Sequence, residues 1–353
     1  MNSKTLFTYP ISLQQLGWKT FFQQQLTLTD LEYSRFAKVI AHHRSGYLLA
    51  TEQGEIPLPV HQSQPLMSIG DWIVLNQEKK FERLLERQSL FSRKAAGSKV
   101  VEQYIAANID TVFIVVALDN DFNLSRIERY LTLANDAQIE PVVVLTKVDL
   151  CDDVEDKIKH VQQLDSQLMI EAVNSLDVSS VKVLLSWCKM GQTIALMGSS
   201  GVGKSSLINA LLGRKVQITA GVREDDNKGR HTTTSRSLHV LASGGLLLDT
   251  PGMRELQLAD CTVGVQETFA DLEVLISQCR FANCQHHTEP GCKVLAAIDN
   301  GLLTERRFNN YQKLLREQAR NGATLADKRL HDKQLSKMYK KVQSTGRKLK
   351  QGD

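Results

Sequence analysis

The chain has 353 residues, of which 42% are hydrophobic, and its net charge is +4. This length and composition allow two or three packed domains and exclude an intrinsically disordered chain. Because the sequence contains no apolar run of about 18 residues and no leader-like segment at its start, we expect a soluble cytoplasmic protein without a membrane span.

The first hundred residues carry no nucleotide-binding motif. Residues 1–30, including Trp18, fit no pattern that we can assign and are treated as an N-terminal extension. From 31 to 98, short β-rich runs such as 46–50 and 71–75 alternate with turn residues. This spacing predicts an OB-fold β-barrel, with a plain structural barrel as the alternative. At its end, 84–97 is expected to be a basic connector into the next domain.

A base-reading motif follows a predicted strand at 141–145. Its residues are Thr146, Lys147, Val148 and Asp149. At the carboxyl end of a parallel strand, the Asp149 carboxylate would accept hydrogen bonds from N1–H and the exocyclic amine of guanine, which adenine does not offer. Lys147 would pack its stem over the base, although so short a motif is also compatible with a surface turn. Asn174 and Ser175, after a further short strand, are expected to supply a second base-contacting loop or, alternatively, a plain polar turn.

A second nucleotide motif lies between a predicted strand at 193–197 and a predicted helix at 205–212. It fits the pattern GxxxxGK[ST] of a phosphate-binding loop, in which backbone N–H groups and a lysine surround the phosphates. Its residues are Gly198, Ser199, Ser200, Gly201, Val202, Gly203, Lys204, Ser205 and Ser206. Lys204 would neutralise phosphate charge, and Ser205 would bind Mg²⁺ together with Asp249, which ends a short apolar run.

Between the phosphate loop and this aspartate lies a polar, glycine-containing segment, which is expected to sense Mg²⁺ and the γ-phosphate or, alternatively, to be a disordered surface loop. Thr233 or Thr232 is its candidate Mg²⁺ ligand. Gly252 closes the Asp-Thr-Pro-Gly motif that begins with the aspartate and is expected to contact the nucleotide. The next residue, Met253, has a thioether that cannot orient the attacking water. His231 is the nearest titratable candidate for that task, and a solvated loop histidine is the alternative.

Three of the six cysteines and a histidine fall between positions 279 and 292. These four residues are Cys279, Cys284, His286 and Cys292. Three thiolates and one imidazole suit a single tetrahedral structural Zn²⁺ with no open position for chemistry. His287 could replace His286, and reduced core cysteines or a disulfide are the alternatives. The scattered Cys151, Cys188 and Cys261 are expected to be ordinary buried thiols.

Positive charge is concentrated at the carboxyl end of the chain. From Lys328 onward, nine lysines and arginines are accompanied by only two carboxylates, Asp332 and Asp353. Such a segment suits a polyanion such as RNA, and a solvated helix face is the alternative. We expect 326–353 to be a basic helical tail.

The order of the motifs is unusual, because the base-reading tetrad precedes the phosphate loop, whereas in an ordinary small G domain the phosphate loop comes first. The order is TKVD, GSSGVGKSS, GRHTTT, DTPGM and C-x4-C-x-H-x5-C, and a β-rich module ending in SRKAAG precedes it. Over about residues 35–320, this order resembles the bacterial ribosome small subunit-dependent GTPase A family, RsgA or YjeQ.

The resemblance implies a multidomain α/β protein. Its parts would be the OB-fold barrel at 31–98, a circularly permuted P-loop GTPase domain at 99–258 and a zinc-binding helical domain at 259–325. It also implies hydrolysis of Mg²⁺-bound GTP to GDP and phosphate in late maturation of the 30S ribosomal subunit, slow alone and stimulated by that subunit. The expected partners are GTP, GDP, the 30S subunit and its 16S rRNA, and we expect a monomer.

The family assigns a catalytic role to the histidine of its GRHTT segment, here His231, and favours His286 over His287 as the metal ligand. Two departures predict somewhat weaker guanine binding. Thr146 stands where asparagine is the commonest residue of G domains, and the last base-contacting loop reads Asn-Ser where Ser-Ala is usual. Two other functions remain as alternatives: a P-loop ATPase, and a nucleotide-regulated RNA-binding protein with little turnover.

Overall fold

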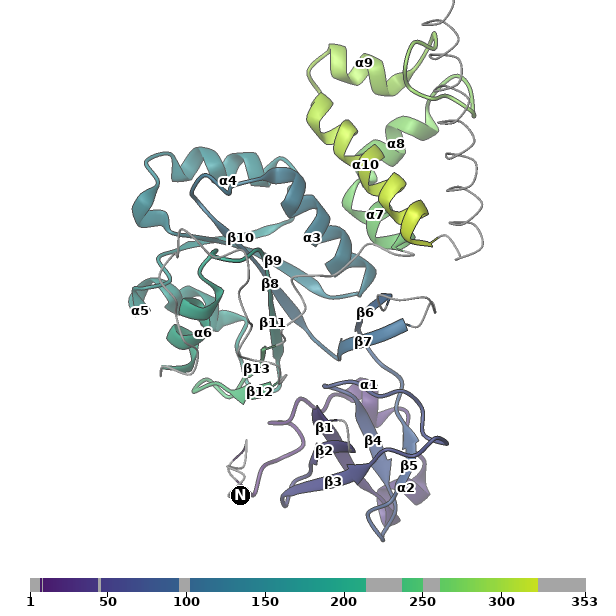
Figure 1. Cartoon of the computed structure of the whole chain (residues 1–353), viewed down its shortest axis with the longest axis vertical. Helices are drawn as coiled ribbons and strands as arrows, with labels where there is room; N and C mark the ends of the chain where they lie inside the picture. Colours follow the sequence, from purple (N-terminus) through teal and green to yellow (C-terminus); the bar gives the residue numbers. More distant parts are fainter. Residues whose placement is uncertain are drawn as a thin grey trace, which may run out of the picture.

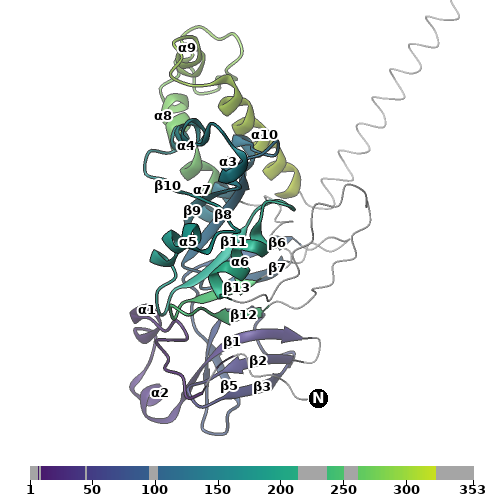
Figure 2. The same cartoon turned by 90° about the vertical axis from the view of Figure 1, so that its left-hand side faces the viewer.

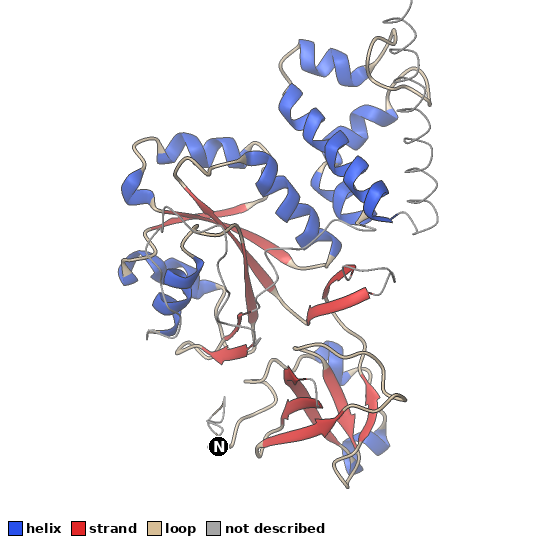
Figure 3. Ribbon diagram, viewed as in Figure 1, coloured by secondary structure: helices blue, strands red, loops and turns tan. Residues whose placement is uncertain are grey.

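The structure is a computed structural model that describes residues 7, 9–43, 46–94, 102–213, 237–249 and 261–322. Three bodies follow one another along its longest axis: an N-terminal antiparallel sheet, a central α/β body and a group of helices (Figure 1). Figure 3 shows the same separation: red strands with two short helices in the N-terminal body, a mixed central body, and helices alone at the other end. None of the helices among the described residues combines the length and the apolarity that a membrane span needs.

The N-terminal body is built from five short antiparallel strands. They are β1 (Arg35–His43), β2 (Gly46–Ala50), β3 (Glu55–Pro59), β4 (Trp72–Leu75) and β5 (Phe81–Leu84). The sheet order is β3-β2-β1-β4-β5, and apolar side chains such as Val39, Leu49 and Ile73 are fully buried on one face. The predicted β-rich module is therefore present. Its described ladders leave β3 and β5 as edge strands, without the pairing that would close a barrel.

The described part of the N-terminal extension, residue 7 and residues 9–30, is folded, although its sequence predicted no structure. It contains α1 (Thr20–Gln23) and α2 (Leu28–Tyr33). Leu16 and Phe22 are buried, and the ring of Trp18 lies edge-on to that of Trp72 in β4, with 4.8 Å between centroids. The extension therefore completes the core on one side of the antiparallel sheet, because its aromatic side chains are removed from water there.

The stretch 84–97, predicted as a connector, contains a strand. This strand, β6 (Leu90–Lys94), pairs antiparallel with β7 (Glu102–Ala107). Positive charge in the stretch is partly neutralised inside the protein, since Arg87 Nε donates to the Asp71 carboxylate at 2.7 Å. The connector is therefore a structured two-stranded link between the two larger sheets.

In the part of the chain that the structure describes, the central body is a six-stranded sheet in which every strand but one is parallel. Its strands are β8 (Thr111–Ala117), β9 (Glu140–Thr146), β10 (Met169–Val173), β11 (Thr193–Met197), β12 (Ser237–Val240) and β13 (Leu246–Asp249). They lie in the order β10-β9-β8-β11-β13-β12, and only β12 runs antiparallel to its neighbour. The order of strands reverses between β8 and β11, which is where open α/β sheets bind ligands.

Both faces of this sheet are covered, which explains its continuous apolar strands. The covering helices are α3 (Leu124–Asp136), α4 (Val154–Gln162), α5 (Val178–Val181) and α6 (Lys204–Leu212). Along β8, Ile114 belongs to the same core as Ile127 of α3, whereas the next residue, Val115, belongs to the core that contains Leu207 of α6. Alternation along one strand thus sends successive side chains into two cores.

The C-terminal body consists of helices packed against α3 (Figures 1 and 2). They are α7 (Thr262–Thr268), α8 (Ala270–Ser277), α9 (Lys293–Asp299) and α10 (Glu305–Gly322). Gly264 of α7 permits a very close approach, because a Cβ atom there would lie 2.1 Å from the Thr132 carbonyl oxygen of α3. Glu128 of α3 is also fully buried and accepts hydrogen bonds from Arg306 and Arg307 of α10.

Candidate nucleotide and metal sites

The phosphate-binding loop connects β11 to α6, as its sequence predicts. Two of its glycines are required by close contacts and positive φ angles. At Gly198, with φ +151°, a Cβ atom would lie 2.3 Å from the Val115 carbonyl oxygen, and at Gly203, with φ +91°, it would lie 3.1 Å from Ser175 Oγ. The loop therefore packs directly against neighbouring strand ends, and only glycine fits at these two positions.

Lys204 is the first residue of α6 and lies within the turn of the loop. Its side chain is largely buried, and its ammonium group donates to the carbonyl oxygen of Gly198 at 2.7 Å and to that of Ser199. Ser205 and Ser206 follow in the first turn of the same helix. The helix N-terminus and the lysine thus place positive charge at one loop, which is the arrangement that binds an anion such as phosphate.

The tetrad begins where β9 ends and contacts the phosphate loop. Thr146 is buried, and its hydroxyl lies 2.7 Å from the Val202 carbonyl oxygen and 3.3 Å from that of Val116. The threonine that replaces the usual asparagine therefore still joins the two motifs through a hydrogen bond. Lys147 has a left-handed backbone with φ +60°, and Asp149 lies exposed in the short helical turn after it.

The second base-contacting loop also reaches this region. Asn174 forms a turn in which its side-chain oxygen accepts from the backbone N–H of Leu176 at 2.9 Å. Ser175 is buried against Gly203 of the phosphate loop. Three segments that are separate in sequence, at 146–149, 174–175 and 198–204, thus meet at the carboxyl edge of one sheet.

The structure describes only part of the predicted Mg²⁺ and catalytic set. Asp249 is the last residue of β13, which pairs in parallel with the phosphate-loop strand β11, so its backbone is at the same edge as Ser205. The switch candidates His231, Thr232 and Thr233, like Gly252 and Met253, lie outside the described residues.

One polar residue at this edge was not identified from the sequence. Asp119 follows β8 and pairs with Lys147, with 2.7 Å between Oδ2 and Nζ. The reasoning used for Asp149, a carboxylate just past a buried parallel strand, would also have identified Asp119.

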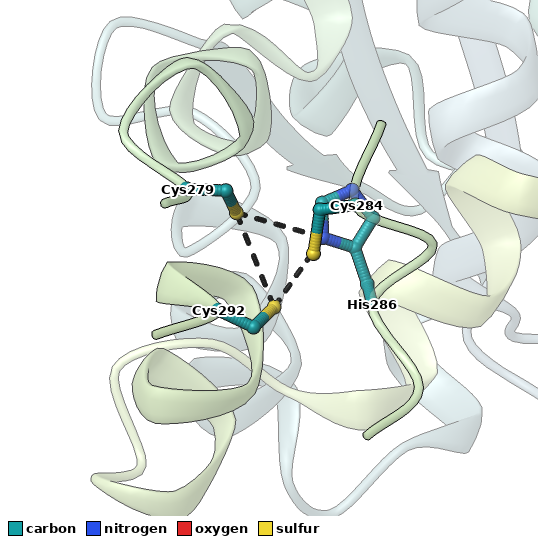
Figure 4. A group of neighbouring side chains, drawn as sticks. All are labelled: Cys279, Cys284, His286 and Cys292. Atoms are coloured by element: carbon teal, nitrogen blue, oxygen red, sulfur yellow. Dashed lines mark hydrogen bonds between the residues drawn. The ribbon is translucent and has the colours of Figure 1, made fainter. Parts of the chain in front are cut away.

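The four metal candidates come together between α8 and α9 (Figure 4). Cys279 follows α8, Cys284 and His286 lie in the next loop, and Cys292 is the N-cap of α9. The ligand atoms of all four lie within 4.8 Å of one another. Of the two candidate histidines, His286 is the one in the cluster, with Nδ1 of its ring directed toward the thiols. The backbone N–H of His287 donates to the Glu289 carboxylate in the same loop.

The spacing of these atoms fits a tetrahedral metal. Around Zn²⁺, ideal bond lengths place two sulfurs about 3.8 Å apart and a sulfur and a nitrogen about 3.5 Å apart. The Sγ atoms of Cys279 and Cys292 are 4.0 Å apart, and Nδ1 of His286 lies 3.7 Å and 3.4 Å from them. These three separations therefore match a tetrahedral metal, and the four residues together could hold one ion.

The surroundings of the cluster fix its loop and shift the pKa values of two of its thiols in opposite directions, since burial raises the pKa of Cys284 to about 11. Burial raises the pKa of the Cys279 thiol, but backbone N–H groups of Lys293 and Val294 at the start of α9 outweigh it and hold the pKa below its ordinary value. Backbone N–H groups of Gln285 and His287 likewise hold the pKa of Glu289 at about 2. Its carboxylate therefore orders the loop that carries two of the ligands.

The three scattered cysteines are not alike, which partly corrects the sequence prediction. Cys188 and Cys261 are buried as expected, and burial raises the pKa of Cys188 to about 12. Cys151 is only partly buried, because it lies in the turn before α4, and its Sγ contacts the Asp153 carboxylate at 3.1 Å.

Two family models match the chain. The one described as RsgA GTPase matches residues 84–259, from the end of the antiparallel sheet to just before α7. A second, described as ABC transporter, matches residues 183–342, a segment that includes the phosphate loop common to many nucleotide hydrolases.

Curated relatives are similar over nearly the whole chain. The protein named small ribosomal subunit biogenesis GTPase RsgA 2 of Vibrio parahaemolyticus is 63% identical over 347 residues, which are 98% of this chain and 97% of the relative. The protein named small ribosomal subunit biogenesis GTPase RsgA of Xylella fastidiosa is 47% identical over 79% of this chain and 84% of its own length.

Solved structures agree in fold. The crystal structure of YjeQ from Thermotoga maritima is 25% identical, has a TM-score of 0.60 and covers 80% of this chain and 98% of its own. The crystal structure of YloQ, described as a circularly permuted GTPase, is 21% identical with a TM-score of 0.58 and shares 81% of this chain and 95% of its own.

Proposed function

This chain belongs to the RsgA GTPase family and is a GTP hydrolase, and we propose that it acts in late maturation of the small ribosomal subunit. The family relationship rests on relatives that match almost end to end, and those relatives are named for small-subunit biogenesis. We expect hydrolysis to be slow in the free protein and faster on the 30S subunit.

The observation that carries the proposal is the contact between the tetrad and the phosphate loop. The hydroxyl of Thr146 lies 2.7 Å from the Val202 carbonyl oxygen, and Ser175 lies against Gly203. A nucleotide that fills this edge would have its base near the tetrad and its phosphates at the N-terminus of α6. The permuted order of the motifs therefore produces one continuous nucleotide site.

The proposed binding roles follow from the chemistry of each side chain. Asp149 would accept from the guanine N1–H and amine, while Lys147 would cover the base. Lys204 and the N–H groups of the loop from Gly198 to Ser206 would bind the phosphates. The remaining nucleotide contacts are assigned to Thr146, Val148, Asn174, Ser175 and Gly252.

The proposed reaction is attack of water on the γ-phosphate of Mg²⁺-bound GTP. A GTPase uses Mg²⁺, and its ligands here would be Ser205, Asp249 and Thr233, with Thr232 as the alternative to the last. When bound, the ion would neutralise charge on the phosphates. Because Met253 cannot orient water, we assign that role to His231. The absence of a glutamine at this position is consistent with slow turnover in the free protein.

We assign a structural Zn²⁺ to the cysteine and histidine cluster. Three thiolates and one imidazole are the ligands that this ion prefers, and they leave no position for a substrate. The ion would connect the end of α8 to the start of α9 through Cys279 and Cys292. Its proposed role is to fix the fold of the 259–325 domain.

The proposed partners beyond the nucleotide are the 30S subunit and its 16S rRNA. The 31–98 domain, as an OB fold, and the basic tail at 326–353 are the proposed RNA-contacting parts, joined through the GTPase domain at 99–258. We propose that the chain acts as a monomer and in the cytoplasm, where ribosomal subunits are assembled.

Nucleotide competition tests the guanine assignment. Binding of labelled GDP should be displaced by GTP but not by ATP, and Asp149→Asn should shift preference from guanine toward xanthine nucleotides, because the amide reverses one hydrogen-bond partner. Equal displacement by ATP would favour the ATPase alternative. The observation that keeps this alternative open is the match to the ABC transporter family model, which overlaps the RsgA GTPase match. Nucleotide binding without turnover, with or without 30S subunits, would favour the RNA-binding alternative.

A further inference from the structure

Asp119 is an acidic residue placed beside the base-reading tetrad by the neighbouring strand. It follows β8, which pairs with β9 so that Ala117 lies opposite Thr146. Its Oδ2 is 2.7 Å from Nζ of Lys147, and the two side chains are 33% and 25% exposed. The pair is therefore at the rim of the proposed base site, with both members partly shielded from water.

The backbone of Lys147 is fixed by its neighbours, whereas its long side chain stays flexible unless another group binds its ammonium. The residue before it, Thr146, is buried and bonded to the phosphate loop, and Lys147 itself has the left-handed φ of +60°. A lysine stem has four rotatable bonds, so it loses considerable rotamer freedom when it lies flat over a base. The ion pair with Asp119 restricts those bonds before a nucleotide arrives.

Asp119 is itself fixed by its own loop. Its Oδ1 accepts from the backbone N–H of Asp121 at 2.8 Å, which leaves Oδ2 for the lysine. The backbone N–H of Leu118 donates to the Thr146 carbonyl oxygen at 2.9 Å, so the loop is connected to the tetrad. Burial raises the pKa of Asp119, but hydrogen bonds from Lys147 and Asp121 outweigh it and keep the carboxyl ionised at neutral pH.

We propose that Asp119 is a positioning residue of the guanine site, which holds the Lys147 side chain in the orientation that covers the base. The proposal rests on the proposed function, because it requires the tetrad to be the base-binding motif. The base is remote from the phosphate that is transferred, so Asp119 contributes equally to binding of GTP and GDP.

The decisive variant is Asp119→Asn, which keeps the shape and removes the charge. Binding of GDP and GTP should weaken about three- to tenfold, which is the cost of ordering one long side chain. KM for GTP should rise by the same factor while kcat at saturating GTP changes less than about twofold. A fall in kcat with unchanged KM would overturn the proposal.

The same loop supplies a matched control. Asp121 lies two residues away, is 42% exposed, and its side chain pairs with Arg126 instead of the tetrad. Asp121→Asn therefore makes the same change in net charge without touching Lys147, and its nucleotide affinity should equal that of the native chain. Equal weakening in Asp119→Asn and Asp121→Asn would show a general effect of charge and overturn the proposal.

A double-mutant cycle separates positioning from loop stability. In a Lys147→Met background the change Asp119→Asn should no longer affect GDP affinity, because there is no ammonium group to hold. A full effect in that background would overturn the proposal. If the native protein binds ADP as tightly as GDP, the guanine site itself is refuted. If the native protein prefers GDP and Asp119→Asn binds GDP with unchanged affinity, only the role of Asp119 is refuted.

Discussion

At the scale of single residues, the buried ammonium group of Lys38 lies where the antiparallel sheet meets the central sheet. Its Nζ donates to the Leu16 carbonyl oxygen at 2.9 Å and to Thr193 Oγ1 at 3.2 Å. Burial, and secondly the nearby charge of Lys19, lowers the pKa of Lys38 from 10.5 to about 7. Lys19 itself is paired with Asp110. One titratable amine thus joins the extension, the antiparallel sheet and the start of β11.

This burial predicts a pH dependence of stability. Between pH 7 and 10.5 the unfolded chain keeps a proton on Lys38 that the folded chain has lost, so the free energy of unfolding should rise with pH in this window. Below about pH 7 the cost of burying the charge is present in full. Lys38→Met should flatten the rise in thermal unfolding temperature between pH 7 and 9, whereas the exposed Lys80→Met should not. An unchanged slope in Lys38→Met would contradict this explanation.

A second residue-scale prediction concerns Lys204 in the phosphate loop. Its ammonium group is held over the carbonyl oxygens of Gly198 and Ser199, where phosphate charge would be neutralised. Lys204→Ala should lower GTP turnover on the order of 100-fold, because a preorganised charge is lost from the reacting phosphate. Lys189→Ala, at an exposed position before β11, is the matched control and should retain full turnover. Turnover that survives Lys204→Ala would place hydrolysis elsewhere.

At the scale of elements, α3 is the main contact between the central body and the helical body. The Glu128 cluster, defined as Glu128, Arg306, Arg307, Asn310 and Asp271, connects α3 to α10 and α8. In it, the Glu128 carboxylate accepts from Arg306 at 2.8 Å, from Arg307 at 2.9 Å and from Asn310 at 2.6 Å. Arg307 also pairs with Asp271 at 2.7 Å. A buried carboxylate with several donors fixes the two bodies in one arrangement.

Removing one member of this cluster should be costly. Glu128→Ala removes the buried carboxylate that Arg306, Arg307 and Asn310 share and leaves only Asp271 to pair with Arg307, so it should lower the free energy of unfolding by about 3 kcal/mol. Glu317→Ala removes the partner of Arg129, a pair at the rim of the same interface, and should cost about 1 kcal/mol or less. Urea unfolding of both variants measures the difference. Equal small losses would mean that the cluster does not hold the bodies together.

Because α7 lies so close to α3, a glycine-to-alanine substitution in α7 should change the folding stability in the direction opposite to that expected from helix propensity. Replacing a helical glycine by alanine ordinarily stabilises by about 0.5–1 kcal/mol. At Gly264 the added Cβ would meet the Thr132 carbonyl oxygen at 2.1 Å, so Gly264→Ala should destabilise by about 1–3 kcal/mol. Gly54→Ala, where a Cβ meets no atom within 4 Å, is the control. Stabilisation by Gly264→Ala would show that α7 is free to move.

The strands that lead into the nucleotide motifs were predictable, because each is a short run of apolar residues followed directly by the polar residues of a motif. Residues 193–197 were expected as a strand and are one, and the expected strand at 141–145 extends from Glu140 to Thr146, while the apolar run at 246–248 lies in β13. The Glu128 cluster was not predictable, since a glutamate in an amphipathic helix is usually solvated and its arginine partners lie nearly 180 residues away. The packing of the N-terminal extension was missed for a similar reason, because its apolar residues have no period.

At the scale of the whole molecule, the helical body is small, and we expect it to depend on the proposed metal ion for part of its stability. Its described part spans only residues 261–322, a length at which a hydrophobic core alone rarely gives more than a few kcal/mol. Stripping metal with a chelator should therefore lower its unfolding temperature, and Cys284→Ser should do the same. Cys151→Ser, at a partly exposed thiol outside the cluster, should have no effect. Metal analysis that finds no zinc in the native chain would contradict the assignment.

The permutation has a mechanical consequence at this scale. Residues 250–260, which include Gly252, connect β13 of the nucleotide sheet to α7 of the helical body. In our account the end of the nucleotide-sensing motif is thus continuous with the proposed zinc domain, which is itself held on α3 by the Glu128 cluster. Loss of the γ-phosphate would then be transmitted to a body that precedes the proposed RNA-contacting tail in the chain.

GTP turnover by the full chain, alone and with 30S subunits, 50S subunits or free RNA at several salt concentrations, tests the proposed function most directly. Turnover should be low alone and rise several-fold with 30S subunits only, and Lys204→Ala should abolish the rise. A generic attraction of the basic tail would instead act through any polyanion and weaken steeply with salt. Equal turnover with and without 30S subunits, or equal stimulation by all three, would contradict a role as a small-subunit GTPase.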